Sequence, residues 1–315
     1  MTRPRLPLGF GLALAVLAAI GVSGRQSPVP PPVPAGQFKT GVEVVSLNVT
    51  VTNGGGRYVT DMNQGEFEVY EDGVKQDVML FSRTSLPLEI SLLVDTSASM
   101  NDKMSTVKTA ASGFVARLRP EDRAQIINFD SRVSVLVPFT ASHPDLDQAI
   151  DKLQAGGSTA LYTALYVSLK ELKTLQVKSA DELNRQAIVM LTDGEDTSSL
   201  VGYDEVLEQS KRSETSVYAI ALRAKDSNIG KGYSEADYVL RQFTSVTGGR
   251  VFFPLGVSEL AGIYSQIWQE LSSQYLIGYT SKSLKRDGRW RRVMVRARRP
   301  ETAVRTRQGY YGPSG

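Results

Sequence analysis

Oxygen-bearing side chains follow two apolar runs of the chain that are typical of buried strands. Asp95, Ser97 and Ser99 come directly after the first run, and Asp193 comes directly after the second. In an open α/β sheet, ligands bind outside the carboxyl ends of the strands, so we expect these side chains to meet at one edge. Carboxylates and hydroxyls are hard ligands, and they favour Mg²⁺, Mn²⁺ or Ca²⁺ over zinc or copper.

A short loop between these two segments supplies further hydroxyls. Gly156-Gly157-Ser158-Thr159 lies just before a predicted helix, so its hydroxyls stand at a helix N-terminus. An Asp–Ser pair after a strand is often only an N-cap, because both side chains accept backbone N–H bonds. The presence of Thr159 and Asp193 beside that pair favours a metal site over a simple cap.

Residue counts exclude much of hydrolase and redox chemistry. The chain has no cysteine, so neither a disulfide framework nor a thiolate site can form. His143 is the only histidine, and a Ser-His-Asp triad or a multi-histidine zinc site would have to depend on it. Its sequence context, Ser-His-Pro-Asp, indicates a turn that enters a helix.

The central part of the chain alternates between strand and helix patterns. We expect strands at 88–94, 124–129, 133–139, 187–191, 217–222 and 251–253, and helices at 103–118, 146–153, 160–175, 203–211, 236–246 and 260–271. The strand at 133–139 is expected at an edge. This alternation predicts an α/β fold with a doubly wound, mainly parallel sheet covered by helices on both faces.

The two ends of the chain show only strand patterns. We expect strands near 42–51, 67–70 and 78–81, with the last two in a small antiparallel set, and further strands at 275–279, 291–297 and 303–307. Asp287-Gly288 predicts a hairpin-type turn between the first two C-terminal strands. Each group alone would bury little core, so we expect both groups to form one antiparallel β-sandwich that flanks the α/β domain.

The first residues predict a secretory leader. Arg3 and Arg5 precede the apolar stretch Leu8–Val22, and small residues suitable for cleavage follow. The stretch is shorter than the ~20 residues of a membrane span, so cleavage is favoured over a retained anchor. The predicted organisation is a signal peptide at 1–24, a proline-rich linker at 25–36, an N-terminal β segment at 37–84, the α/β domain at 85–273 and a C-terminal β segment at 274–315.

Positive charge is concentrated near the C-terminus. Residues 282–308 hold eleven Lys and Arg against two acidic residues, so this segment carries +9 and the rest of the chain −6. Arg292, Arg296 and Arg298 alternate with apolar residues, which favours a surface strand with a solvated arginine face; attraction of anionic partners is the alternative. We expect no nucleic-acid partner, because the leader directs the chain out of the cytoplasm, to the periplasm or the cell exterior.

Three of these segments together resemble a known family. Asp95-Thr96-Ser97-Ala98-Ser99 resembles the DxSxS motif of von Willebrand factor type A domains, Gly156–Tyr162 resembles their glycine–threonine loop, and Leu191–Gly194 resembles their third motif. From about residue 40 to 312 the chain also resembles a bacterial group of secreted proteins that carry this domain. The shared features there are Phe67–Gly73, Thr247-Gly248-Gly249 and Tyr275–Tyr279.

The resemblance implies a metal-ion-dependent adhesion site. In it, Ser97, Ser99 and Thr159 bind the metal through hydroxyls, and Asp95 and Asp193 act largely through bound waters; Ser158 is the alternative to Thr159. Mg²⁺ is the expected ion, with Mn²⁺ or Ca²⁺ as alternatives, and an acidic residue of a protein partner completes the coordination. In some family members ligand binding moves the last helix, here 260–271.

The sequence therefore predicts a non-enzymatic, metal-dependent protein-binding module of an exported bacterial protein. A metal-dependent hydrolase that uses Asp95 is one alternative. It is disfavoured because Ser97 stands where such an enzyme would have its second carboxylate. A structural envelope protein with no metal-dependent ligand is the other alternative.

Overall fold

The computed structural model describes residues 44–83, 86–178, 184–193, 195–222 and 234–315. All of them fall within one compact unit, Val42–Gly315. The predicted signal peptide and proline-rich linker lie outside the described residues. Among the described residues, no helix is both long and apolar enough to cross a membrane.

The predicted central sheet is present and has six strands in the order β10-β9-β8-β5-β6-β7. Their bounds are β5 (Leu88–Asp95), β6 (Arg123–Phe129), β7 (Val133–Thr140), β8 (Arg185–Thr192), β9 (Ser216–Ala221) and β10 (Val251–Phe252). Neighbouring strands are parallel except β6 and β7, which are antiparallel. β7 lies at the edge of the sheet, as predicted.

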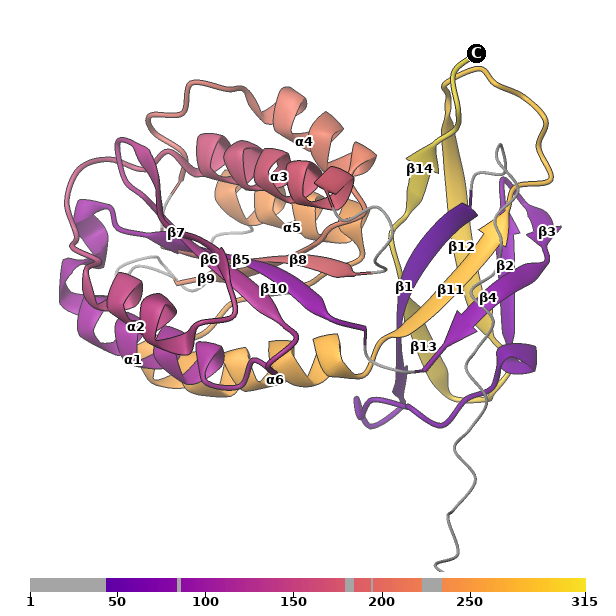
Figure 1. Cartoon of the computed structure of the whole chain (residues 1–315), viewed down its shortest axis with the longest axis horizontal. Helices are drawn as coiled ribbons and strands as arrows, with labels where there is room; N and C mark the ends of the chain where they lie inside the picture. The colour runs from indigo at the N-terminus through magenta and orange to yellow at the C-terminus, as the bar shows by residue number, and fades with distance from the viewer. Residues whose placement is uncertain (1–43, 84–85, 179–183, 194, 223–233) are drawn as a thin grey trace, which may run out of the picture. The chain divides into compact units, whose positions relative to one another are not determined.

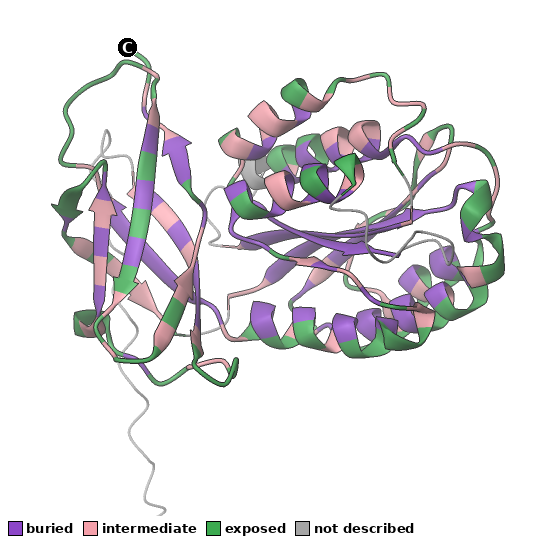
Figure 2. Cartoon of the chain, turned by 180° about the vertical axis from the view of Figure 1, so that it is seen from behind, coloured by how far each residue is buried: buried purple, intermediate pink, exposed green. Residues whose placement is uncertain are grey.

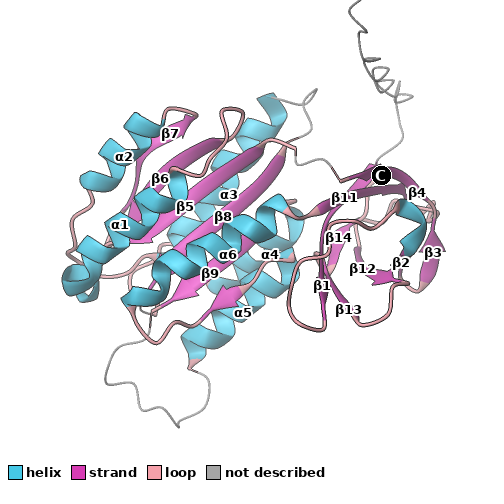
Figure 3. Ribbon diagram, turned by 90° about the horizontal axis from the view of Figure 1, so that it is seen from below, coloured by secondary structure: helices cyan, strands magenta, loops and turns pink. Residues whose placement is uncertain are grey.

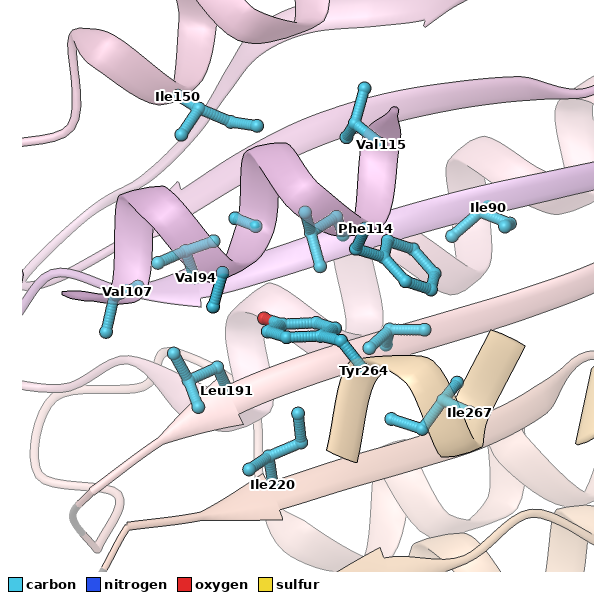
Figure 4. Packing of buried hydrophobic residues seen from close by; sticks show 14 of the residues in the cluster. Ile90, Val94, Val107, Phe114, Val115, Ile150, Leu191, Ile220, Tyr264 and Ile267 are labelled. Carbon is cyan, nitrogen blue, oxygen red and sulfur yellow. The ribbon is translucent and has the colours of Figure 1, made fainter. Parts of the chain in front are cut away.

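Helices cover both faces of this sheet (Figures 1 and 3). One face carries α1 (Met104–Val115), α2 (His143–Asp151) and α6 (Leu260–Ser272), and the other carries α3 (Leu161–Lys178), α4 (Tyr203–Arg212) and α5 (Glu235–Thr247). Each face has its own apolar core. Tyr264 of α6 packs between Phe114 of α1 and the strand residues Val94 and Leu191 (Figure 4).

The two central strands, β5 and β8, are buried along their whole length (Figure 2). Helices cover both of their faces, and this is why each reads in the sequence as a nearly continuous apolar run rather than as an alternating pattern. The end of each strand is therefore well defined in sequence. A short 3₁₀ helix, Ala98–Lys103, connects β5 to α1.

The strands at the two ends of the chain form two antiparallel four-stranded sheets around one apolar core. Their orders are β13-β1-β11-β4 and β14-β12-β2-β3. The bounds are β1 (Val44–Asn53), β2 (Phe67–Glu71), β3 (Val74–Gln76), β4 (Val78–Ser82), β11 (Tyr275–Thr280), β12 (Trp290–Ala297), β13 (Thr302–Arg305) and β14 (Gly309–Tyr311). Both sheets contain strands from both ends of the chain, as the predicted sandwich requires.

Two local predictions about the sandwich are wrong, and two strands, β3 and β14, were not predicted. Asp287-Gly288 does not join a paired hairpin, because β11 and β12 lie in different sheets and the nine residues between them cross from one sheet to the other. β2 and β4 also lie in opposite sheets, since the unpredicted strand β3 takes the place beside β2. The single strand predicted at 303–307 is β13, and β14 follows in the other sheet.

The turn after α5 brings the α/β domain into contact with the sandwich. Gly248 caps α5 in the left-handed conformation, with φ of 80°, and a Cβ atom there would lie 2.5 Å from the nitrogen of Arg307. At Gly249 a Cβ atom would overlap the carbonyl oxygen of Val217 in β9. Only glycine allows the backbones to approach this closely.

Candidate metal site

Asp95 is the last residue of β5 and is completely buried. One carboxylate oxygen accepts a hydrogen bond from the Ser97 nitrogen at 2.8 Å, and the other accepts one from the Thr192 hydroxyl at 2.6 Å. Thr192 ends β8, which pairs in parallel with β5, so the two strand ends lie side by side. Burial raises the pKa of Asp95, and the hydrogen bonds from Thr192 and Ser97 oppose that rise.

Ser97, Ser99 and Asp193 form a continuous hydrogen-bonded chain. The Oγ atoms of Ser97 and Ser99 lie 3.1 Å apart, and the Ser99 hydroxyl donates to a carboxylate oxygen of Asp193 at 2.7 Å. Ser97 is buried and Ser99 is exposed, so the chain runs from the protein interior to the surface. The sequence placed these three side chains at neighbouring strand ends, and the structure brings them together.

Backbone hydrogen bonds hold the Thr159 loop against both strand ends. The Ala98 nitrogen donates to the Gly157 oxygen at 3.0 Å, which joins this loop to the one after β5. Thr197 and Thr159 also bind one another: the Thr159 nitrogen donates to the Thr197 hydroxyl at 2.9 Å, and the Thr197 nitrogen donates to the Thr159 oxygen at 2.8 Å. Thr159, which is 5% exposed, therefore lies in the loop between the segments that carry Ser97 and Asp193.

Ser158 has a different environment from Thr159. It is exposed, and its hydroxyl binds the hydroxyl of Ser131 at 3.0 Å. Gly157 has φ of 78°, and a Cβ atom there would lie 2.5 Å from the Ser131 Oγ. The sharp turn at Gly157 thus directs Ser158 to Ser131 and favours Thr159 as the hydroxyl available to a metal.

Lys103 is a member of the site that sequence reasoning missed. Its ammonium group forms an ion pair with Asp193, whose side chain is only 2% exposed. The sequence pattern indicated only that Lys103 begins a helix, and no spacing rule connects it to a residue ninety positions later. A cation therefore already contacts the carboxylate that ends the hydrogen-bonded chain.

Asp196 has a structural role that the sequence did not indicate. Its carboxylate accepts hydrogen bonds from the Tyr162 nitrogen at 3.1 Å and from the Ser199 hydroxyl at 2.5 Å. These bonds fix the loop after β8 to the start of α3. Thr159 immediately precedes this helix end, so Asp196 helps to hold the Thr159 loop in place.

The spacing of the oxygens fits a small divalent cation. Octahedral Mg²⁺ with ligand distances of about 2.0–2.1 Å places neighbouring ligand oxygens about 2.9 Å apart. The observed separation of 3.1 Å between the hydroxyl oxygens of Ser97 and Ser99, the two proposed ligands, is close to that value. Among the described residues no group of three or more His, Cys, Asp or Glu residues could hold a metal, so a cation here would depend on hydroxyl ligands.

Residues 90–195 match the family model of the von Willebrand factor type A domain. The chain therefore contains a domain of this family, and the matched region includes all five predicted site residues. The six-stranded sheet between two layers of helices, with polar side chains at the ends of β5 and β8, agrees with this match. The wider resemblance to secreted bacterial proteins stays a prediction.

Relatives and solved structures support the fold assignment. An uncharacterized protein of Synechocystis sp. is 26% identical over 202 residues, which are 63% of this chain and 44% of that protein. A UPF0353 protein of Mycobacterium leprae is 23% identical over 226 residues, which are 63% of this chain and 65% of that protein. The chain thus spans less than two thirds of the length of either relative. A von Willebrand factor type A structure from Catenulispora acidiphila has a TM-score of 0.50 at 12% identity and covers 88% of this chain and 76% of its own.

Proposed function

We propose that this protein is a non-enzymatic module that binds a protein partner through a divalent cation, with Mg²⁺ as the favoured ion and Mn²⁺ or Ca²⁺ as alternatives. The hydroxyls of Ser97, Ser99 and Thr159 hold the ion, and Asp95 and Asp193 orient them and bind its waters. The observation that carries the proposal is the hydrogen-bonded chain from buried Ser97 to Asp193, with a spacing between the Ser97 and Ser99 oxygens suited to Mg²⁺.

The choice of ligands explains why a partner carboxylate is expected. Hydroxyl ligands are neutral, so a divalent ion bound mainly by them keeps most of its positive charge. Asp95 cannot turn toward the ion freely, because both of its oxygens already accept hydrogen bonds inside the protein. The bound ion therefore attracts an acidic side chain from outside.

The same contacts disfavour the hydrolase alternative. A hydrolase of this kind would use Asp95 as its nucleophile, and a nucleophile must reach its substrate. Asp95 is completely buried and is held by Ser97 and Thr192, so it presents no oxygen to a substrate. The predicted leader supports action outside the cytoplasm, in the periplasm or at the cell exterior.

Calorimetric titration of the metal-stripped protein with Mg²⁺, Mn²⁺ and Ca²⁺ tests this proposal. We expect saturable binding at one site, which disappears in the Asp95→Ala/Ser97→Ala double variant and in Thr159→Val, where the shape of the side chain is kept and its hydroxyl is lost. Ser158→Ala is the matched control and should bind normally. The absence of binding by the unmodified protein would rule out the metal-dependent mechanism in favour of a structural role. Loss of binding in Ser158→Ala alone would assign the ligand to Ser158.

A further inference from the structure

A cleft lined by arginines lies where the α/β domain meets the sandwich. It has a volume of about 880 Å³ and is bordered by α5, β10, β12 and the segment from β13 to β14. Five arginines line it: Arg241, Arg250, Arg292, Arg305 and Arg307. None of the described residues that line this arginine cleft is Asp or Glu. Its volume is in the range that binds ligands, about 300–1,000 Å³.

Half of the eight Lys and Arg residues of segment 282–308 that lie outside the cleft form ion pairs with acidic residues. Ion pairs join Arg291 to Glu71, Arg298 to Glu68 and Arg299 to Asp61. Arginines in the cleft are only partly balanced: Arg305 pairs with Glu270, and Arg307 lies 3.5 Å from Glu214. In the described part of the chain, the exposed residues Arg250 and Arg292 have no carboxylate within salt-bridge distance. The cleft therefore carries uncompensated positive charge of its own.

Aromatic rings hold three of these guanidinium groups. Arg241 lies 4.6 Å from the ring centre of Phe253, Arg250 lies 4.7 Å from that of Phe252, and Arg307 lies 5.7 Å from that of Tyr310. Stacking keeps an arginine planar fork oriented before a ligand arrives, so less conformational entropy is lost on binding.

Arg307 supplies an independent sign of a missing ligand. It is only 9% exposed, and its Nε atom has no hydrogen-bond partner within the described structure. A buried donor without a partner is costly, because it has lost its water and gained nothing. An anionic group in the cleft would supply the missing acceptor.

Apolar side chains between the arginines indicate the kind of ligand. Val251 of β10, Val304 of β13 and Trp290 line the cleft and are partly exposed, whereas Val293 and Val295 of β12 belong to the buried core of the sandwich. β10 and β13 are edge strands, and edge strands leave main-chain groups that can pair with an added extended peptide. A surface that carries arginines beside partly exposed apolar side chains complements a segment that carries carboxylates beside apolar side chains.

We propose that the arginine cleft binds an extended segment of a protein that carries Asp or Glu among apolar residues. The carboxylates pair with Arg250 and Arg292 at the open side and with Arg307 deeper in. This site does not depend on the proposed metal site. Arg250 precedes β10 and so lies at the amino ends of the parallel strands, whereas Ser97 and Asp193 follow their carboxyl ends.

The test is fluorescence anisotropy with a short labelled peptide of alternating glutamate and valine, in EDTA so that no metal site contributes. The cleft variant is Arg250→Ser/Arg292→Ser, and the control is Arg57→Ser/Arg117→Ser, which removes the same charge from exposed positions outside the cleft. We expect the cleft variant to weaken binding by at least about tenfold and the control by less than about twofold. Arg250→Lys/Arg292→Lys should restore only part of the affinity, because lysine lacks the arginine fork.

Four outcomes would overturn the proposal. They are no binding by the unmodified protein, equal weakening by the cleft and control variants, equal binding of a peptide with glutamine in place of glutamate, and binding of a sulfated polysaccharide without binding of the peptide. Circular dichroism and thermal unfolding of both double variants exclude misfolding as a cause, because none of the four substituted side chains makes an ion pair within the described residues.

Discussion

Replacement of Lys103 by methionine should strengthen metal binding and lower the free energy of unfolding of the metal-free protein. The Lys103 ammonium pairs with Asp193, and the two side chains are 23% and 2% exposed. A divalent ion beside Ser99 and Asp193 would be repelled by this ammonium. At an ion–ammonium distance of about 6 Å and an effective dielectric constant of about 20, the repulsion is about 5 kcal/mol. The lysine side chain is flexible, so it should move into solvent rather than remain in place.

The cost of metal binding is then the loss of one charged hydrogen bond, about 1.5–3 kcal/mol. Methionine has a similar length and no charge, so Lys103→Met removes this cost and should tighten Mg²⁺ binding about ten- to 150-fold. In the metal-free protein the same substitution leaves Asp193 without its cation beside buried Asp95. Its free energy of unfolding should fall by about 1.5–3 kcal/mol, and Mg²⁺ should restore it.

Two measurements test this reasoning together: calorimetric titration with Mg²⁺, and chemical denaturation in EDTA and in excess Mg²⁺. Lys108→Met is the control, since Lys108 lies in α1, the helix that follows Lys103, but donates to the Asp151 carbonyl away from the site. A dissociation constant in Lys103→Met within twofold of the unmodified value would refute competition between the ammonium and the ion. Weaker binding would show instead that Lys103 holds Asp193 in a binding position.

Two further predictions concern the junction between the α/β domain and the sandwich. Glu270 is 1% exposed and pairs with Arg305, so Glu270→Gln should lower the free energy of unfolding by about 3 kcal/mol. In a double variant that also carries Arg305→Met, the loss should be smaller than the sum of the two single losses. A loss equal to that sum would contradict this coupling. Gly249→Ala should lower the free energy of unfolding by more than about 3 kcal/mol, because the added Cβ atom overlaps the Val217 carbonyl. The control is Gly113→Ala at an exposed position of α1, which should be neutral or stabilising. Equal thermal stability of the two variants would contradict the steric argument.

The sequence was sufficient to predict the central sheet and the strand ends at which most residues of the candidate site lie. β5 and β8 read as apolar runs because helices cover both of their faces, and this made the ends of the two strands visible. Once the strands are known to be parallel, Asp95 and Asp193 must follow the same edge of the sheet. The sequence indicated only a loop at Gly157; the sharp turn there and its close approach to Ser131 appear in the structure.

Contacts that depend on register could not be predicted in the same way. The hydrogen bond from Thr192 to Asp95 exists because β5 and β8 pair with Val94 opposite Leu191, and no single-chain pattern gives that pairing. The strands β3 and β14 have only three residues each, too few for an alternating pattern to appear. Their assignment depends on partners supplied by distant segments, and this is why the hairpin at Asp287-Gly288 was predicted wrongly.

The connection between the two parts of the fold explains how they can remain one compact unit. The chain leaves the sandwich after β4 and returns as β11, and these strands pair directly, with Ser82 opposite Leu276. An inserted domain whose ends lie side by side leaves the strand pairing of its host undisturbed. The α/β domain can therefore carry its site at the far ends of β5 and β8 without any change in the sandwich.

Glu270 near the end of α6 makes this junction stiff. Its carboxylate accepts hydrogen bonds from Tyr218 of β9 at 2.7 Å and from Tyr58 at 3.3 Å, besides its pair with Arg305 of β13. Burial, followed by the charge of Glu270, raises the pKa of Tyr58 to about 12, so these bonds persist at physiological pH. Movement of α6 in response to a ligand would have to carry β13 with it or break a buried ion pair, which costs about 3–5 kcal/mol. Arg305 belongs to both the junction and the cleft lining, so a movement of α6 would reach the arginine cleft through this residue.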